Sequence, residues 1–404
     1  MIHLPLEINK ALVDMKISTF TPVQEKAIPV ILEGKNLIAL SETGSGKTLA
    51  FILPLLGRLI GVPKRPTKIL IITPTKELSE QILVVAKKCA RHTNIISTSL
   101  YGGKSFSEQE RELKKGIHLI VACPGRLKDH IDKATIDLSG IETVVLDEAD
   151  QLMDMGFLPH IRTALEATKN RKQTLLFSAT MSDEVKILTE EFLTDAILVE
   201  FEANKAKAIV TEAFCPITEE LRYPFIRFLL KHYKIKACII FTRTKEEARS
   251  LNVLFKEDNY KSAVLEGDMT THQRKKALGG LKEKTISIMV ATDIAARGLD
   301  IPHVTHIINL NPPLNAESYI HRLGRTARHD KGGMAITIFM PDEKAHLEKI
   351  LEDQGKIFKL TKFKEFNYQL RIEKRNLRMI KYKSPGSDQD EYENDFKNDF
   401  KDDF

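Results

Sequence analysis

The sequence contains little cysteine, which argues against two classes of protein. Only four cysteines occur among the 404 residues, and they are Cys89, Cys123, Cys215 and Cys238. No two of them have the spacing of metal ligands, and no disulfide framework is visible in their positions. We therefore predict reduced thiols, as expected for a protein of the cytoplasm.

The sequence also lacks a long hydrophobic run. Its most apolar stretch, residues 49–61, is too short to cross a bilayer and contains Arg58. The N-terminus does not show the basic region followed by an apolar region that marks a signal peptide. We therefore predict a cytoplasmic location and no membrane partner.

Neither sign of charge is in large excess. The formal net charge is +6, and this mildly basic balance favours a polyanionic partner only weakly. Hydrophobic residues make up 42% of the chain and charged residues 29%, which is ordinary for a globular protein. The length predicts about two or three domains.

Short runs rich in Ile, Val and Leu recur along the chain, with helical patterns such as residues 76–90 between them. In the first half these runs are residues 37–40, 69–73, 118–122, 143–146 and 174–177. In the second half they are residues 237–241, 262–265, 286–290, 306–309 and 334–339. Continuous apolar runs are typical of strands buried on both faces of a parallel sheet. The pattern predicts two tandem α/β domains, at residues 1–203 and 210–365, joined by a linker at 204–209.

The C-terminal residues 366–404 differ in character from the rest. Residues 371–383 carry six basic residues and one acid, spaced so that several could share one helical face. This stretch is either an extension of a nucleic-acid contact or a solvated terminal helix, and the sequence leaves both open. Residues 387–404 contain eight acids and two lysines in a near-repeat, which predicts disorder.

The most specific local pattern in the first half follows the strand predicted at 37–40. It consists of Thr43, Gly44, Ser45, Gly46, Lys47 and Thr48. Glycines allow the backbone N–H groups of such a loop to surround a phosphate, and the following helix N-terminus adds positive partial charge. Lys47 is predicted to reach the β- and γ-phosphates of a nucleotide, and the Thr48 hydroxyl to bind Mg²⁺. Ser41 stands where the general pattern has its first glycine.

Acidic residues follow the strand predicted at 143–146. Asp147 and Glu148 come first, and Ala149 and Asp150 complete the group. Beside a phosphate loop, Asp147 is predicted to hold Mg²⁺ through water, and Glu148 to orient and deprotonate the water that attacks the γ-phosphate. Together the two patterns predict an ATP-hydrolysing enzyme.

These four residues, with the motifs that follow, resemble the DEAD-box RNA helicases over roughly residues 7–345. The resemblance implies two RecA-like domains, each a mostly parallel sheet flanked by helices, with a cleft between them. It implies an RNA-dependent ATPase that uses ATP and Mg²⁺ to unwind short RNA duplexes locally. It also implies a monomeric core that contacts the sugar-phosphate backbone of RNA and therefore has little sequence preference.

The resemblance assigns adenine recognition to Gln24, whose amide matches the donor and acceptor of the adenine edge. Lys16 and Ile17 stand where the family usually has a Gly followed by an aromatic residue. A further aromatic residue that stacks on the base would fall before Met1 by count. We therefore expect adenine binding without this stacking contact.

The RNA-facing loops implied by the resemblance occur in both halves. In the first half they contain Pro74, Thr75, Lys76, Gly102, Gly103, Pro124, Gly125 and Arg126. In the second half they contain Thr242, Arg243, Thr292, Asp293 and Arg297. Lys76 replaces the usual Arg and keeps the charge without the guanidinium fork. Cys123 replaces the usual Thr and loses one hydroxyl.

The second half also contributes residues toward the nucleotide. Three arginines lie within residues 322–328, and the resemblance assigns Arg325 and Arg328 as arginine fingers for the γ-phosphate. Ala327 replaces the usual glycine of this motif. Asp300 is assigned to the ribose. Coupling between the domains is assigned to Ser178, Thr180, Asp150 and His321.

Two alternatives remain open at this point. An ATP-gated RNA clamp or scaffold would carry the same motifs, and a DNA helicase is a less favoured alternative. The sequence does not identify the RNA or a pathway such as ribosome assembly, RNA decay or cold adaptation. Protein partners could bind through the C-terminal tail.

Overall fold

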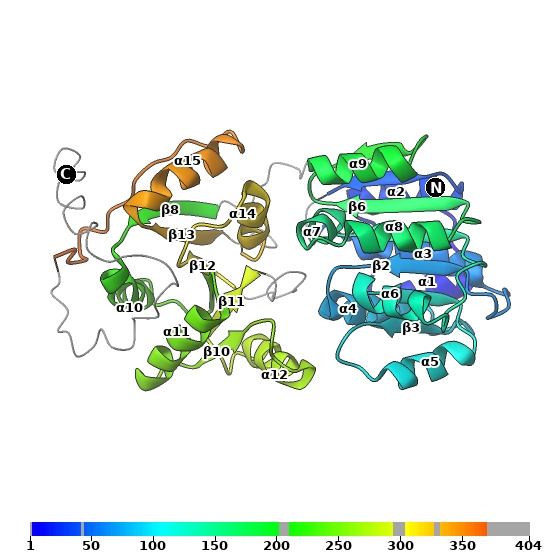
Figure 1. Ribbon diagram of the computed structural model, residues 1–404, viewed down its shortest axis with the longest axis horizontal. Helices are drawn as coiled ribbons and strands as arrows, with labels where there is room; N and C mark the ends of the chain where they lie inside the picture. The colour runs from blue at the N-terminus through cyan, green and yellow to red at the C-terminus, as the bar shows by residue number, and fades with distance from the viewer. Residues whose placement is uncertain (1, 42–43, 202–209, 294–303, 327–331, 370–404) are drawn as a thin grey trace. The chain divides into compact units, whose positions relative to one another are not determined.

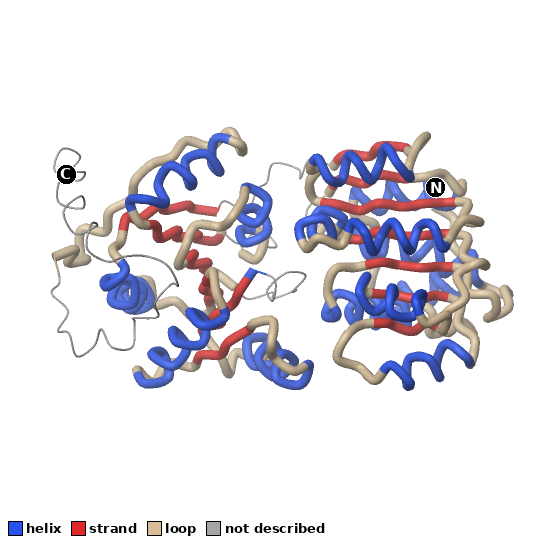
Figure 2. The backbone as a smooth tube through the Cα atoms, in the orientation of Figure 1, coloured by secondary structure: helices blue, strands red, loops and turns tan. Residues whose placement is uncertain are grey.

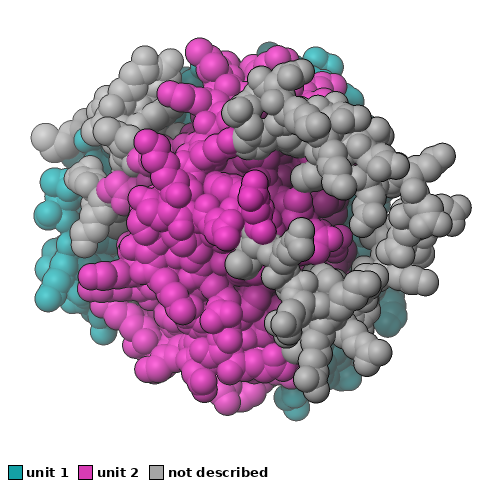
Figure 3. Space-filling view, turned by 90° about the vertical axis from the view of Figure 1, so that its left-hand side faces the viewer, with its two compact units in different colours: residues 1–206 teal, residues 207–404 magenta. Residues whose placement is uncertain are grey.

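The computed structural model describes residues 2–41, 44–201, 210–293, 304–326 and 332–369. The chain divides into two compact units, residues 1–206 and 207–404, which are coloured separately in Figure 3. The predicted linker at 204–209 and the basic and acidic stretches at 371–404 lie outside the described residues. The same holds for Thr43, Arg297, Asp300 and Arg328. Figure 2 shows that strands form the centre of each unit and that helices surround them.

The first unit contains a seven-stranded parallel sheet in the order β3–β4–β2–β5–β6–β1–β7 (Figure 1). Its strands are β1 (Leu37–Leu40), β2 (Ile69–Ile72), β3 (Ser97–Leu100), β4 (Leu119–Ala122), β5 (Thr143–Asp147), β6 (Gln173–Ser178) and β7 (Ile197–Glu200). Its helices are α1 (Leu6–Asp14), α2 (Pro22–Leu32), α3 (Lys47–Leu59), α4 (Lys76–Cys89), α5 (Phe106–Lys114), α6 (Pro124–Asp132), α7 (Ala149–Asp154), α8 (Leu158–Ala167) and α9 (Asp183–Phe192).

The second unit contains a six-stranded parallel sheet in the order β10–β11–β9–β12–β13–β8. Its strands are β8 (Val210–Pro216), β9 (Cys238–Thr242), β10 (Ser262–Leu265), β11 (Ile288–Thr292), β12 (His306–Asn309) and β13 (Gly333–Phe339). Its α-helices are α10 (Arg222–His232), α11 (Lys245–Glu257), α12 (Thr271–Lys282), α14 (Ala316–Leu323) and α15 (Lys344–Glu352). Two short 3-10 turns are η1 (Glu219–Leu221) and η2 (Pro341–Glu343). The predicted fold class, two parallel-sheet α/β units in tandem, is confirmed.

Both faces of the first sheet are buried, which explains the continuous apolar runs of the sequence. Successive side chains of a strand point to opposite faces. Ile69 and Ile71 of β2 therefore pack in the layer formed with α1 to α4, whereas Leu70 and Ile72 pack in the layer formed with α6 to α9. Each face of the sheet thus has its own hydrophobic core.

Three strands were not predicted from the sequence, and all three lie at sheet edges. They are β3 and β7 at the two edges of the first sheet and β8 at one edge of the second. An edge strand pairs on one side only, so it depends less on apolar side chains. Strand β3 has the sequence Ser-Thr-Ser-Leu, and β7 alternates between half-buried and exposed residues.

The core of the second unit extends a few residues past the predicted boundary at 365. Phe363 and Phe366 pack against Phe225 of α10, with ring centroids 5.6 and 4.9 Å away. Tyr368 packs on Phe366, and its hydroxyl accepts a hydrogen bond from the Phe363 N–H. Packing therefore continues to at least Tyr368.

The cysteine thiols lie in buried surroundings that raise their pKa. All four cysteines are free, and burial raises the pKa of the Cys89 thiol to about 11 and that of Cys123 to about 12. Such thiols stay protonated at neutral pH and are poor nucleophiles.

Within the described residues, no helix is both long and apolar enough to cross a membrane.

Candidate active site

Apart from Gln24 of α2, the described site residues that the sequence predicted in the first unit lie at the carboxyl end of its sheet. Because all seven strands are parallel, their carboxyl ends meet at the same edge. The loops that follow β1, β6 and β5 carry the phosphate loop, Ser178 with Thr180, and the acidic group. The loops that follow β2, β4 and β3 carry the predicted RNA residues. Ligand sites of open parallel sheets form at this edge.

The phosphate loop is held by its own lysine and serines. The Lys47 ammonium donates to the Ser41 carbonyl at 2.8 Å, and the Ser41 and Ser45 hydroxyls are hydrogen-bonded to each other. Gly44 has φ +88° and Gly46 has φ +96°, a left-handed conformation that favours glycine. Helix α3 begins directly after Gly46, so its first N–H groups are available to an anion.

Gln24, predicted to recognise adenine, contacts this loop directly. Its side-chain amide donates to the Gly46 carbonyl at 3.0 Å, and its amide oxygen accepts from the Thr21 N–H at 3.0 Å. A Cβ atom placed on Gly46 would collide with the Gln24 amide. Gln24 therefore connects the start of α2 to the backbone that would surround the phosphates. The sequence did not predict this contact.

The acidic pair is buried beside Lys47. Asp147 ends β5 with 2% of its surface exposed, and Glu148 follows in a left-handed conformation with φ +52°. The Glu148 N–H donates to the Asp147 carboxylate at 3.1 Å. Burial first, and then the charge of Glu148, raise the pKa of Asp147 to about 7, although Lys47 opposes this shift.

The pair has the chemistry of a divalent-cation site. Among the described residues, one buried oxygen of the Glu148 carboxylate has no hydrogen-bond partner, and Asp147 is a buried acid of raised pKa. Thr48 is the second residue of α3, directly after Lys47. Hard cations such as Mg²⁺ prefer carboxylate and hydroxyl oxygens, often through water. These residues therefore fit the predicted Mg²⁺.

The raised pKa of Asp147 leads to a stability prediction. Its usual pKa is 3.8, so between about pH 4 and pH 7 the unfolded chain has lost this proton while the folded chain retains it. Stability therefore falls as pH rises through this window and levels off above about pH 7. Asp147→Asn removes the ionisation but can still accept the hydrogen bond from Glu148.

We expect Asp147→Asn to raise the melting temperature of the nucleotide-free protein. The gain should be small at about pH 5 and largest at about pH 8, because only the wild-type carboxyl must ionise in the folded state. Thermal unfolding of both proteins at the two pH values measures it. A gain of the same size at both would contradict the assigned cause.

Asp150 connects the acidic group to the end of β6, within the first unit. Its carboxylate accepts from the Ala179 N–H at 2.9 Å and from the Thr180 N–H at 3.0 Å. Its own N–H donates to the Ser178 hydroxyl at 3.1 Å. The residues predicted for coupling in this unit therefore form one hydrogen-bonded cluster. Whether they couple to the second unit stays a prediction.

The predicted RNA residues of the first unit lie in neighbouring turns. Thr75 caps α4 by accepting from the Leu78 N–H, and the N-terminus of α6 begins at Pro124. Arg126 donates to the Lys104 carbonyl at 2.9 Å and so joins α6 to the turn that contains Gly102 and Gly103. A Cβ atom on Gly102 or Gly125 would meet nothing within 4 Å. These turns therefore leave open backbone at the edge.

In the second unit, Thr242 and Thr292 are paired neighbours at the carboxyl ends of β9 and β11. Arg243 follows β9, and its guanidinium donates to the Glu343 carboxylate at 2.7 Å. Its backbone N–H donates to the Asn311 side chain at 3.2 Å. The described members of the RNA set predicted in this unit thus also lie at the carboxyl end of their sheet.

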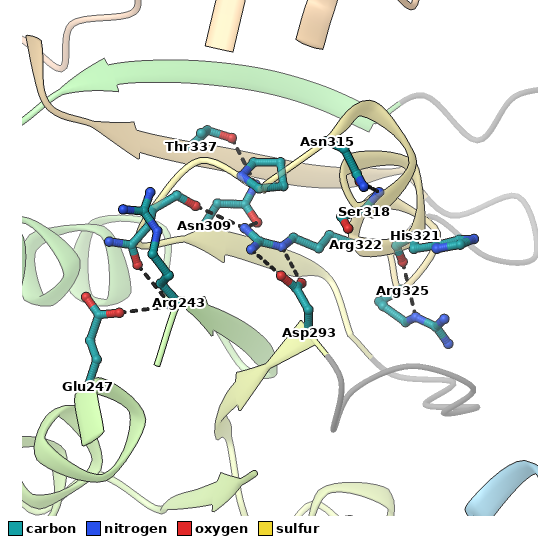
Figure 4. Close-up of polar contacts among 12 residues, drawn as sticks. Arg243, Glu247, Asp293, Asn309, Asn315, Ser318, His321, Arg322, Arg325 and Thr337 are labelled. Carbon is teal, nitrogen blue, oxygen red and sulfur yellow. Dashed lines mark hydrogen bonds and ion pairs between the residues drawn. The ribbon is translucent and has the colours of Figure 1, made fainter. Parts of the chain in front are cut away.

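Asp293 has a partner that the sequence did not suggest. Arg322 donates to both oxygens of its carboxylate, at 2.6 and 2.8 Å (Figure 4). Contact with RNA stays a prediction for Asp293, but its carboxylate is already used. Among the three arginines of residues 322–328, the sequence assigned a role to Arg325 and Arg328 only, whereas Arg322 is 3% exposed and pairs with Asp293. The only hint of this ion pair in the sequence is that an acid follows one predicted strand and an arginine lies in a later helical segment.

His321 and Arg325 come from the end of α14. Arg325 follows this helix, and its Nε donates to the His321 carbonyl at 3.2 Å (Figure 4). This bond holds the Nε atom of the Arg325 guanidinium against the end of the helix. The finger role of Arg325 stays a prediction, and Arg328 lies outside the described residues.

Comparison with known proteins identifies the family. The DEAD/DEAH box helicase family matches residues 21–188, and the helicase conserved C-terminal domain matches residues 222–330. The DEAD-box ATP-dependent RNA helicase RhpA of Helicobacter pylori is 40% identical over 349 residues, which are 85% of this chain and 70% of RhpA. The ATP-dependent RNA helicase CshA of Listeria monocytogenes is 40% identical over 351 residues, 87% of this chain and 67% of CshA.

Solved structures of the same fold were determined with ligands. Dbp5 of S. cerevisiae bound to RNA and ADP BeF3 superposes with a TM-score of 0.77 at 28% identity, covering 89% of this chain and 94% of Dbp5. Mss116p bound to ssRNA and AMP-PNP gives a TM-score of 0.79 at 28% identity, covering 88% of this chain and 77% of Mss116p. The chain therefore belongs to the DEAD-box ATP-dependent RNA helicases, a family of ATP-hydrolysing enzymes with two RecA-like domains.

Proposed function

We propose that this protein is an RNA-dependent ATPase that locally unwinds or remodels short RNA duplexes. One observation carries the proposal. A single sheet edge in the first unit holds the buried acidic pair and Lys47 next to the loops predicted to contact RNA. RNA binding to the loops after β2 and β4 can therefore affect ATP hydrolysis at the neighbouring loops after β5, β6 and β1.

The residues of the first unit have separate roles in hydrolysis. Lys47 exchanges the Ser41 carbonyl for the β- and γ-phosphates when ATP binds, and Gln24 holds the loop backbone near the adenine. Glu148 takes the proton of the attacking water. Asp147 and Thr48 hold Mg²⁺, which neutralises phosphate charge when bound. The buried position of the pair keeps bulk water away from these charges.

The second unit completes the site in this proposal. ATP binds in the cleft between the two domains, where Arg325 and Arg328 stabilise charge on the γ-phosphate in the transition state, and Asp300 contacts the ribose. Hydrolysis then requires closure of the domains, and RNA that contacts both domains favours closure. Contacts to the RNA backbone and 2′-hydroxyls give little sequence preference.

Strand displacement separates unwinding from ATP-gated clamping. We expect the full chain to release the labelled strand of a short RNA duplex in the presence of ATP and Mg²⁺, and not with ADP. ATP-dependent retention of single-stranded RNA without release of the strand would instead support the clamp. A monomeric core and protein partners at the C-terminal tail are further proposals that this assay leaves aside.

A further inference from the structure

Arg322 is a buried arginine that serves four acceptors at once. It lies in the last turn of α14 and is 3% exposed. Its guanidinium donates to both Asp293 oxygens, to the Asn309 side-chain oxygen at 3.0 Å and to the Asn311 carbonyl at 3.0 Å (Figure 4). Its carbon centre also lies 5.0 Å from the centre of the Phe241 ring. All three nitrogens of the guanidinium therefore donate hydrogen bonds.

These acceptors come from segments that follow or end different strands of the second sheet. Asp293 follows β11 and precedes the segment that contains Arg297 and Asp300. Asn309 ends β12, and its amide donates to the Thr337 hydroxyl of β13 at 2.9 Å. One arginine thus joins the carboxyl ends of β11, β12 and, through Asn309, β13.

The same connection reaches the loop after β9. Asn311, whose carbonyl accepts from Arg322, also accepts the Arg243 N–H with its side-chain oxygen at 3.2 Å. Arg243 and Asp293 were both assigned to RNA, whereas α14 leads directly into Arg325. Arg322 is therefore the described side chain through which the RNA-facing loops contact the helix that carries the finger.

We propose that Arg322 is a positioning residue that transmits RNA binding in the second unit to the arginine-finger helix. This inference rests on the proposed function. RNA contacts at Arg243 and at the end of β11 fix Asn311 and Asp293, and these two residues hold Arg322 and with it α14. The coupling then appears as RNA stimulation of ATP hydrolysis and not as affinity for either ligand alone.

Lysine cannot make the contacts that Arg322 makes, so substitution by lysine tests these contacts separately from the charge. A lysine keeps the positive charge but presents a single ammonium, so it cannot serve Asp293 on one side and Asn309 with Asn311 on the other. Arg322→Lys should therefore preserve the charge balance of this buried region and remove the connection. A control with the same chemical change is Arg227→Lys, because Arg227 pairs with Asp258 at 2.9 Å on the α10 side of this unit.

The experiment measures ATPase kcat and the KM for ATP of the full chain, with and without saturating oligo(U) RNA, together with RNA affinity in the absence of nucleotide. For Arg322→Lys we expect the RNA-stimulated kcat to fall about tenfold or more, with little change in the KM for ATP or in RNA affinity. Arg227→Lys should behave as wild type. A parallel loss of RNA affinity, kcat and melting temperature in Arg322→Lys would show a structural role only and overturn the proposal.

A double-mutant cycle with Asp293→Asn provides the second measurement. If Arg322 acts through Asp293, the double variant should lose little more stimulation than Arg322→Lys alone. If the loss of RNA stimulation in the double variant equalled the product of the losses in the two single variants, the proposal would be overturned. Wild-type protein that RNA fails to stimulate would overturn the proposed function and this inference with it, whereas equal stimulation of wild type and Arg322→Lys would overturn the inference alone.

Discussion

Glu148→Gln is expected to abolish ATP turnover while ATP still binds. Glutamine keeps the shape of the side chain but cannot take a proton, and a positioned general base contributes about 10²- to 10⁴-fold in rate. The buried Glu148 oxygen, which has no hydrogen-bond partner in the part of the chain that the structure describes, is the group that would face the attacking water. Steady-state ATPase rates and the affinity for a fluorescent ATP analogue, measured on the same preparation, check both parts.

Glu142→Gln is the matched control for this variant. Glu142 is an acid of the same unit that pairs with Lys68 at 2.6 Å just before β5 begins, at the opposite edge of the sheet. We expect it to keep wild-type turnover. Near wild-type turnover by Glu148→Gln would remove Glu148 from its role as the base.

Arg325→Ala has the second largest expected effect. An arginine finger is worth about 10³-fold or more in rate, because its charge stabilises the γ-phosphate in the transition state. The RNA-stimulated kcat should therefore fall by about that factor, and Arg328→Ala should act in the same way. Binding of ATP to the first unit should change little, since the phosphate loop and the acidic pair are intact.

The control for the finger is Arg227→Ala, which removes an arginine of the same unit from the Asp258 pair. It should retain RNA-stimulated ATPase. If Arg325→Ala and Arg328→Ala both kept full stimulation by RNA, the arginines of this motif would have no part in the chemistry, and the completion of the site by the second unit would have to be abandoned.

The sequence predicted the interior strands well because both of their faces are buried. Four consecutive apolar residues, as in β1, leave few alternatives to a strand inside a parallel sheet. The edge strands β3 and β8 were missed because polar residues interrupt their apolar pattern: β3 reads Ser-Thr-Ser-Leu although it is buried, and β8 begins with half-buried and exposed residues. The motifs that follow these interior strands lie on one side of the sheet because parallel strands end together, and the roles of their residues stay predictions.

The connections between motifs were not predictable from spacing. Arg322 and Asp293 are far apart in sequence, and only the parallel arrangement of β11, β9 and β12 brings the Asp293 loop to α14. The bond from Gln24 to Gly46 likewise depends on how α2 packs against α3. A motif indicates which chemistry a segment can perform, whereas its hydrogen-bond partners depend on tertiary packing.

The central claim is that RNA controls ATP hydrolysis by this chain. Its most direct test compares the ATPase rate of the full chain alone, with single-stranded RNA, and with DNA of the same sequence, at one salt concentration. The account predicts strong stimulation by RNA and little by DNA, because the contacts proposed include 2′-hydroxyls. Equal stimulation by both nucleic acids, or none by either, would contradict it.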